Sequence, residues 1–373
     1  MSITISLKKV NKKADPKNPV WKGPEEDGIT FSLLSRFLCC RERFRLLVVE
    51  GLKPADTFNH RLEFGSMWHV CEESLAANDK SLRGLYPWDE CLKDYAQSLC
   101  KRYPTSQEQI DNWYGICKMM FPIYVKHWSE HPDVVDRTPL LQEQSFNIPY
   151  ALPSGRTVKL RGKWDSVDLV GKGKAGIYLQ ENKTKSDINE GQIKRQISFD
   201  LQTMLYLVAL QEWDDDNTRQ GVFAGEAAGK GFWVGAGAKV AGVRYNVVKR
   251  PRHYQGKRES KAEFLERLKG IIEASPEEFF MRWKVELTPG DVSKFRRECL
   301  DPILEQLCDW WEWVRDHPLP FGPRIDGSVI HWRHPFGVYN VLDEGGSTDL
   351  DEYLASGSEV GLQRTDNLFP ELT

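Results

Sequence analysis

The sequence predicts an α/β fold with a central mixed β-sheet, and three observations support this class. Apolar residues recur at helical spacing through most of the first third of the chain. The middle holds short β-prone runs at 142–150, 157–170 and 177–183, separated by Pro- and Gly-containing turns. Amphipathic helices are expected after them, near 192–212, 261–274 and 291–316. Helices on either side of such runs indicate a sheet flanked by helices.

The elements can be placed in order along the chain. Residues 1–28 form an extended basic arm, and 29–135 form a helical region. Its helices are expected at 30–48, capped by Thr30 or Ser32, and at 61–77, 88–101 and 106–130. The sheet core is expected at 136–248, where strands are also predicted at 221–223, 231–234 and 240–248. A basic loop with C-terminal helices follows at 249–340, then a weakly structured tail at 341–373.

Composition narrows the classes of function. Lys plus Arg total 51 against 54 Asp plus Glu, a net charge of −3, so binding to nucleic acid needs local basic patches. One patch spans 244–261 and contains Lys249, Arg250, Arg252, Lys257 and Arg258. The alternative is a solvated charged face. No window reaches the ~20 apolar residues that span a bilayer, and the N-terminus lacks an apolar signal core. We therefore expect a cytoplasmic protein with reduced cysteines.

Acidic residues on two of the predicted strands suggest a metal site. Asp165 lies on the strand before a Gly-rich turn, and Glu181-Asn182-Lys183 lies on the next strand. Because side chains alternate along a strand, Glu181 and Lys183 share one face, and a hairpin brings Asp165 beside them. Two adjacent carboxylates repel each other unless a hard cation such as Mg²⁺ or Mn²⁺ binds between them. A neighbouring Lys can then orient the attacking water.

Three further residues fit such a site. Gln202 and Tyr206 are four apart on the expected helix 192–212, so both project from one face. His69 follows Gly65-Ser-Met-Trp on the helix 61–77. Each feature has an ordinary alternative: a surface ion pair for Glu-x-Lys, helix packing for Gln202 and Tyr206, and a structural role for His69. The order of the motifs along the chain favours the functional interpretation.

Taken together, these motifs resemble the RecB-like branch of the PD-(D/E)XK nuclease superfamily, close to the CRISPR-associated RecB-like exonucleases and their phage relatives. The matching motifs span about residues 30–248. The resemblance implies a restriction-endonuclease-like core and a Mg²⁺- or Mn²⁺-dependent deoxyribonuclease, with exonuclease favoured over endonuclease. It implies that His69, Asp165 and Glu181, with the Asn182 carbonyl, hold the metal. Lys183 would position water, and Gln202 and Tyr206 would brace Lys183 or contact DNA.

This sequence departs from that family in one respect. Many relatives bind an iron–sulfur cluster through an early Cys and a late C-x-x-C-x5-C. Here Cys39 and Cys40 are present, but His331, His334 and Asn340 occupy the late positions. We therefore expect no iron–sulfur cluster, and we expect aromatic packing through Trp310, Trp311, Trp313 and Phe336 instead. The two histidines either bind zinc with Cys39 or Cys40 or form ordinary hydrogen bonds, and the second interpretation is favoured.

Three functions follow from these expectations. The first is a metal-dependent DNA nuclease of recombination, repair or phage DNA processing, acting in a bacterial or phage-infected cell. Recombination or replication proteins would be its partners, and no membrane would be involved. The second is a DNA-end-binding protein of the same fold with little or no catalysis. The third is a metal-dependent phosphoesterase with a substrate other than DNA. The presence of Asp165, Glu181 and Lys183 together favours the first.

Overall fold

The computed structural model describes residues 19–54, 58–76, 88–129, 131, 137–171, 176–187, 200–220, 240–316, 362–365, 367–369 and 372. The expected strands at 221–223 and 231–234, and His331, His334, Phe336 and Asn340, lie outside these residues. The chain forms two compact units, each built from separated stretches. One comprises 1–56, 146–162 and 296–373, and the other comprises 57–145 and 163–295.

A mixed sheet of five strands forms the centre of the fold and confirms the predicted α/β class. Its strands are β2 (Arg137–Ala151), β3 (Thr157–Val170), β4 (Gly176–Lys185), β5 (Val240–Lys249) and β6 (Phe280–Glu286), in that order. The β3–β4 and β5–β6 pairs are antiparallel, whereas β4 and β5 are parallel. The predicted β3–β4 hairpin is therefore present, with a parallel strand beside it, so β4 is flanked on both edges.

Strand β6 was not expected, although its sequence carries a signal for it. Met281, Trp283 and Val285 alternate with polar Arg282, Lys284 and Glu286, which is the pattern of a half-buried edge strand. By contrast, residues 177–182 of β4 are all buried, because β4 is a central strand that α3 also covers. Helix α8 (Leu201–Gln220) contacts β5, and the hydroxyls of Thr203 and Tyr245 lie 2.6 Å apart.

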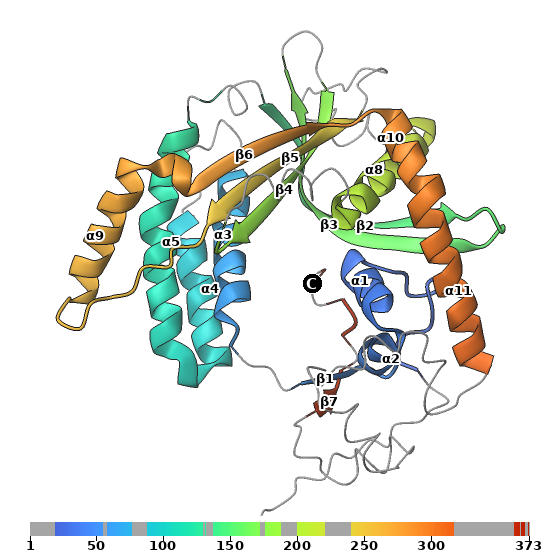
Figure 1. Ribbon diagram of the computed structural model, residues 1–373, viewed down its shortest axis with the longest axis horizontal. Coiled ribbons are helices and arrows are strands. Elements are labelled where there is room, and N and C mark those ends of the chain that lie inside the picture. Colours follow the sequence, from blue (N-terminus) through green and yellow to red (C-terminus); the bar gives the residue numbers. More distant parts are fainter. Residues whose placement is uncertain are drawn as a thin grey trace, which may run out of the picture. The chain divides into compact units, whose positions relative to one another are not determined.

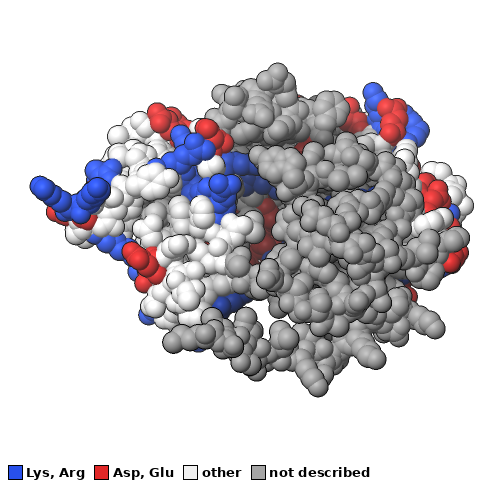
Figure 2. Space-filling model, turned by 60° about the horizontal axis from the view of Figure 1, so that its bottom comes forward, with Lys and Arg blue, Asp and Glu red and all other residues white. Residues whose placement is uncertain are grey.

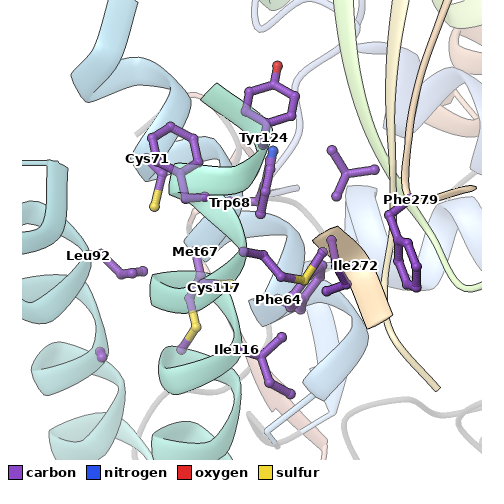
Figure 3. Close-up of a cluster of buried hydrophobic side chains, with 14 of the residues drawn as sticks. Phe64, Met67, Trp68, Cys71, Leu92, Ile116, Cys117, Tyr124, Ile272 and Phe279 are labelled. Carbon is purple, nitrogen blue, oxygen red and sulfur yellow. The ribbon is translucent and has the colours of Figure 1, made fainter. Parts of the chain in front are cut away.

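A group of helices packs beside the sheet in the larger unit (Figure 1). It consists of α3 (His60–Ala76), α4 (Trp88–Arg102), α5 (Gln107–Trp128) and α9 (Lys261–Ala274). Their shared core contains the fully buried Phe64, Trp68 and Cys117 (Figure 3). Gly65 allows α3 to approach β4 closely, since a Cβ added there would lie 3.1 Å from Thr184 Oγ1. This packing places α3, which carries His69, directly against the strand with Glu181 and Lys183.

The other unit has its own aromatic core. It contains α1 (Phe31–Cys39), α2 (Arg41–Phe44), α11 (Asp301–Asp316) and the short strands β1 (Leu52–Pro54) and β7 (Leu362–Arg364). Thr30, one of the two caps suggested by the sequence, caps α1 by accepting a hydrogen bond from Leu33 N. The Trp310 ring packs edge-on against Phe37 and Phe44, and Trp311 packs likewise against Trp21. The expected packing of α1 against the late tryptophans is confirmed for Trp310.

Among the described residues, the one further α-helix is α10 (Pro289–Phe295), which lies along the chain between β6 and a short turn of π-helix at Arg296–Leu300. Within the described part of the chain, no helix combines the length and apolar character needed to cross a bilayer.

Candidate active site

Asp165 lies where β3 and β4 stop pairing. The paired residues run from Val170 with Gly176 to Ser166 with Gln180. Asp165 and Glu181 are therefore the first residues beyond the pairing, at the end away from the turn. Oδ2 of Asp165 accepts a hydrogen bond of 2.7 Å from the backbone N–H of Asn182. This bond ties the Asp165 carboxylate to the strand that carries Glu181 and Lys183. The two carboxylates that the sequence placed in one hairpin are thus brought to the same end of the strand pair.

Lys183 connects the strand to helix α8. Its Nζ donates to Glu181 Oε2 at 2.7 Å and to Gln202 Oε1 at 3.0 Å. Oε1 of Glu181 is buried and has no hydrogen-bond partner among the described residues, and only 1% of the Glu181 side chain is exposed. A buried carboxylate oxygen without a donor is costly unless a cation or a proton compensates it. This oxygen therefore fits a metal ligand.

Burial and charge set the protonation of these groups in the metal-free protein. Burial raises the pKa of Glu181, Lys183 lowers it and the Asp165 carboxylate raises it, so the net shift is upward, to about 7. Burial lowers the pKa of Lys183, but the carboxylates of Glu181 and Asp165 raise it more, so the net shift is upward. Lys183 is therefore a cation that can orient water or offset charge on a phosphoryl oxygen.

Tyr206 lies one turn after Gln202 on α8 and remains a neutral phenol. Burial raises its pKa, and the Glu181 carboxylate adds to the rise. Its backbone carbonyl accepts a hydrogen bond of 3.2 Å from Trp164 Nε1, which fixes α8 against β3 next to Asp165. The structure thus brings Gln202 and Tyr206 to the strand segment that carries Glu181 and Lys183.

His69 approaches Asp165 from α3, together with a residue that the sequence did not suggest. Ligand atoms of His69, Glu143 and Asp165 all lie within 4.8 Å of one another. Burial lowers the pKa of His69, but Asp165, Glu143 and Glu72 raise it more, to about 9. Glu143 is on β2, and no motif marks it among the acids of the chain. Only the fold shows that it lies in this group.

The Asn182 side chain belongs to a buried hydrogen-bond network. It is buried, and its Oδ1 accepts hydrogen bonds from Asn246 Nδ2 at 3.0 Å and from Gln180 Nε2 at 3.2 Å. Asn246 also donates to Glu72 and Tyr124, which extends this buried network to α3 and α5. The backbone carbonyl of Asn182 is therefore the part of this residue that suits the role of the expected ligand.

The predicted basic run begins at Lys249, the last residue of β5, and continues along the connection to α9. The backbone N–H of Arg250 donates to Lys185 O at 2.7 Å, so the run begins beside the end of β4, two residues after Lys183. Arg252, Lys257 and Arg258 are exposed, and Lys249 and Arg250 are half-buried. Lys and Arg side chains gather in the left half of the face in Figure 2, the side where α9 lies in Figure 1.

A family model described as the PD-(D/E)XK nuclease superfamily matches residues 29–300 of this 373-residue chain. The chain belongs to this superfamily. A search of curated proteins finds no match. PD-(D/E)XK nucleases depend on divalent metals. The donors here fit such ions, because the Glu143 and Asp165 carboxylates converge with the His69 imidazole. Glu181 is not in that group, but its buried Oε1 has no hydrogen-bond partner among the described residues.

Proposed function

We propose that this protein is a metal-dependent deoxyribonuclease of the RecB-like branch, acting as an exonuclease in recombination, repair or phage DNA processing. The observation that carries the proposal is the geometry on β3 and β4. Asp165 is tied to the backbone of Asn182, Glu181 has a buried oxygen with no donor among the described residues, and Lys183 stands beside it. The ion pair with Lys183 uses only Oε2 of Glu181, so the buried Oε1 remains available to a cation.

Each residue has a distinct role in this proposal. His69, Asp165 and Glu181, with the Asn182 carbonyl, would hold Mg²⁺ or Mn²⁺, and the imidazole favours Mn²⁺ because it is the softer ligand. When bound, the cation supplies Lewis-acid activation of water and of the phosphodiester. Lys183 holds a proton at Nζ and orients the attacking water. Gln202 fixes Lys183 through its 3.0 Å hydrogen bond, and Tyr206 excludes solvent beside it.

DNA is the proposed substrate because a basic segment leaves the sheet next to the site. Lys249, Arg250, Arg252, Lys257 and Arg258 would contact backbone phosphates over the connection from β5 to α9. The Arg250 guanidinium lies 5.7 Å from the centre of the Trp113 ring, and the His60 ring stacks on the same indole. Cationic and aromatic side chains in one patch are suited to a nucleic-acid backbone with exposed bases.

The test uses end-labelled linear and circular single-stranded DNA of one sequence, incubated with the protein in Mg²⁺ and in Mn²⁺. The proposal predicts that the linear DNA is degraded and that the circle survives. Equal cleavage of the circle would make the enzyme an endonuclease. Tight, salt-dependent binding without cleavage of either substrate would indicate an end-binding protein. Absence of both binding and cleavage would point to another phosphoester substrate.

A further inference from the structure

Glu143 has an unusual backbone conformation for its place in a strand. Its φ is +45°, and it is the only residue other than glycine with a positive φ in the described part of the chain. The left-handed region is sparsely populated for a residue with a Cβ, so the surrounding structure must hold Glu143 there. The contacts of the Glu143 carboxylate with Lys163 and His69 are consistent with such a constraint.

The Glu143 carboxylate lies in the metal group described above. One ligand atom each from His69 on α3, Glu143 on β2 and Asp165 on β3 falls within 4.8 Å of the other two. Three separate elements thus direct two carboxylates and an imidazole to one point. A second observation also indicates a cation. Oε1 of Glu181, on a side chain that is only 1% exposed, has no hydrogen-bond partner among the described residues, and the next residue, Asn182, is bound through its N–H to Asp165.

In the metal-free protein, Glu143 is balanced by a neighbouring lysine. Lys163 Nζ lies 2.7 Å from Glu143 Oε2, and His69 Nδ1 lies 3.9 Å from Glu143 Oε1. The Glu143 side chain is 12% exposed and that of Lys163 is 34% exposed. A partly exposed ammonium group can move into solvent at little cost. A dication could therefore replace Lys163 as the partner of Glu143 without rearrangement of the strands.

We propose that Glu143 is a further ligand of the divalent cation, and that Lys163 is its counter-ion while the site is metal-free. This inference rests on the metal centre of the proposed function. It adds a carboxylate from β2 to the residues expected from the sequence, so that β2, β3, β4 and α3 would each contribute to the site. The competing explanation is that Glu143 only anchors Lys163 to β2.

The two explanations differ in what removal of Lys163 does. If Glu143 is a ligand, Lys163 competes with the metal for its carboxylate, so Lys163→Met should leave Mn²⁺ affinity unreduced or raise it. If Glu143 only anchors Lys163, removing either partner breaks the same ion pair. Glu143→Gln and Lys163→Met should then have equal effects on metal binding.

The experiment is a titration of the EDTA-treated full-length protein with Mn²⁺ alone, followed by electron paramagnetic resonance and calorimetry, without DNA. Glu143→Gln should weaken Mn²⁺ binding about tenfold or more, in the range seen when groups supporting a metal are removed. Glu266→Gln is the matched control, because it removes the same charge from a side chain on α9 that is 78% exposed. It should bind like the wild type.

Two outcomes would overturn the inference: Glu143→Gln binding Mn²⁺ like Glu266→Gln, or Glu143→Gln and Lys163→Met weakening it equally. Asp165→Asn tests the proposed function separately. If Asp165→Asn binds Mn²⁺ like the wild type, the proposed metal centre is wrong, and not only the role of Glu143. Glu143→Gly guards against misfolding of the Gln variant. Glycine adopts a φ of +45° without strain, so this variant should melt no lower than the wild type in EDTA and still bind Mn²⁺ weakly.

Discussion

Two aspartates on β3, three residues apart, lie in opposite electrostatic surroundings. Asp168 is fully buried and pairs with Arg137 at 2.8 Å and Arg244 at 3.5 Å, and Ser166 Oγ donates to it at 2.7 Å. We call these four residues with Gln180 the Asp168 cluster. Arg244 also donates to Gln180 at 3.0 Å. One carboxylate in this cluster is thus matched by two guanidinium groups.

The Asp165 cluster consists of His69, Glu143, Asp165, Glu181 and Lys183. Its Glu143 and Asp165 carboxylates converge with His69. Glu181 pairs with Lys183, and Glu143 pairs with Lys163. Asp165 itself accepts a hydrogen bond from a backbone N–H. Burial alone therefore does not mark a functional carboxylate. The guanidinium groups that pair with Asp168 are largely buried, at 16% and 3% exposure. Glu143 in the Asp165 cluster is instead paired with Lys163, which is 34% exposed and can give way to a cation from solution.

The strongest effect is expected on catalysis at Asp165. Asp165→Asn and Glu181→Gln should each reduce DNA cleavage about 10³-fold or more, because the metal contributes several kcal/mol of charge stabilisation. Both should also abolish Mn²⁺ binding, measured by titration of EDTA-treated protein. Asp165→Asn should not lower the free energy of unfolding in EDTA, since its amide oxygen can still accept the hydrogen bond from Asn182 N–H and the change removes a charge that repels Glu181. Wild-type cleavage by both purified variants would place the active site elsewhere.

The matched change in the other cluster should affect stability first. Asp168→Asn leaves Arg137 and Arg244 without their carboxylate, so the free energy of unfolding should fall by about 3 kcal/mol. Urea denaturation in EDTA measures this, with Asp165→Asn as the control. An Asp168→Asn protein as stable as the wild type would contradict the contrast drawn between the two clusters.

Substitution of Lys183 separates metal binding from catalysis. Lys183→Met should retain Mn²⁺ binding but cleave DNA about 10²-fold more slowly, as expected on removal of a group that orients water or transfers a proton. The measurement is a single-turnover rate beside an Mn²⁺ titration. If metal affinity and rate fall together in Lys183→Met, Lys183 acts by holding Glu181 in place.

The weakest effect is expected outside both clusters. Changing Arg252 and Lys257 to Gln should weaken DNA binding and reduce the slope of log affinity against log salt by about 2, one for each phosphate that is no longer neutralised. Mn²⁺ affinity should stay the same. Lys269→Gln, in the second half of α9, is the control for the loss of a single positive charge. An unchanged slope would show that the run is a solvated surface.

Local pattern was enough to predict the β3–β4 hairpin and the helices α3, α4, α5 and α9, because strand alternation and helix caps depend on neighbouring residues. The single helix expected at 30–48 was wrong, because the extended backbone of Cys40 ends α1 and the chain continues as α2 and a turn of π-helix. Pattern also placed Asp165, Glu181 and Lys183 together, since two strands joined by a short turn must pair. Glu143 could not be predicted in this way. Its proximity to His69 depends on how β2 and α3 meet across 74 residues of sequence. Strand β6 did carry the alternation that would have identified it.

The proposed mechanism requires a divalent cation at the Asp165 cluster for DNA cleavage, and chelation removes that cation. Purified protein is incubated with end-labelled linear DNA in EDTA, and Mn²⁺ is then added in excess to the same reaction. The proposed site predicts no cleavage in EDTA and recovery of cleavage after Mn²⁺. Asp165→Asn should remain inactive in both. Equal cleavage by the wild type with and without chelator would contradict a metal-dependent mechanism.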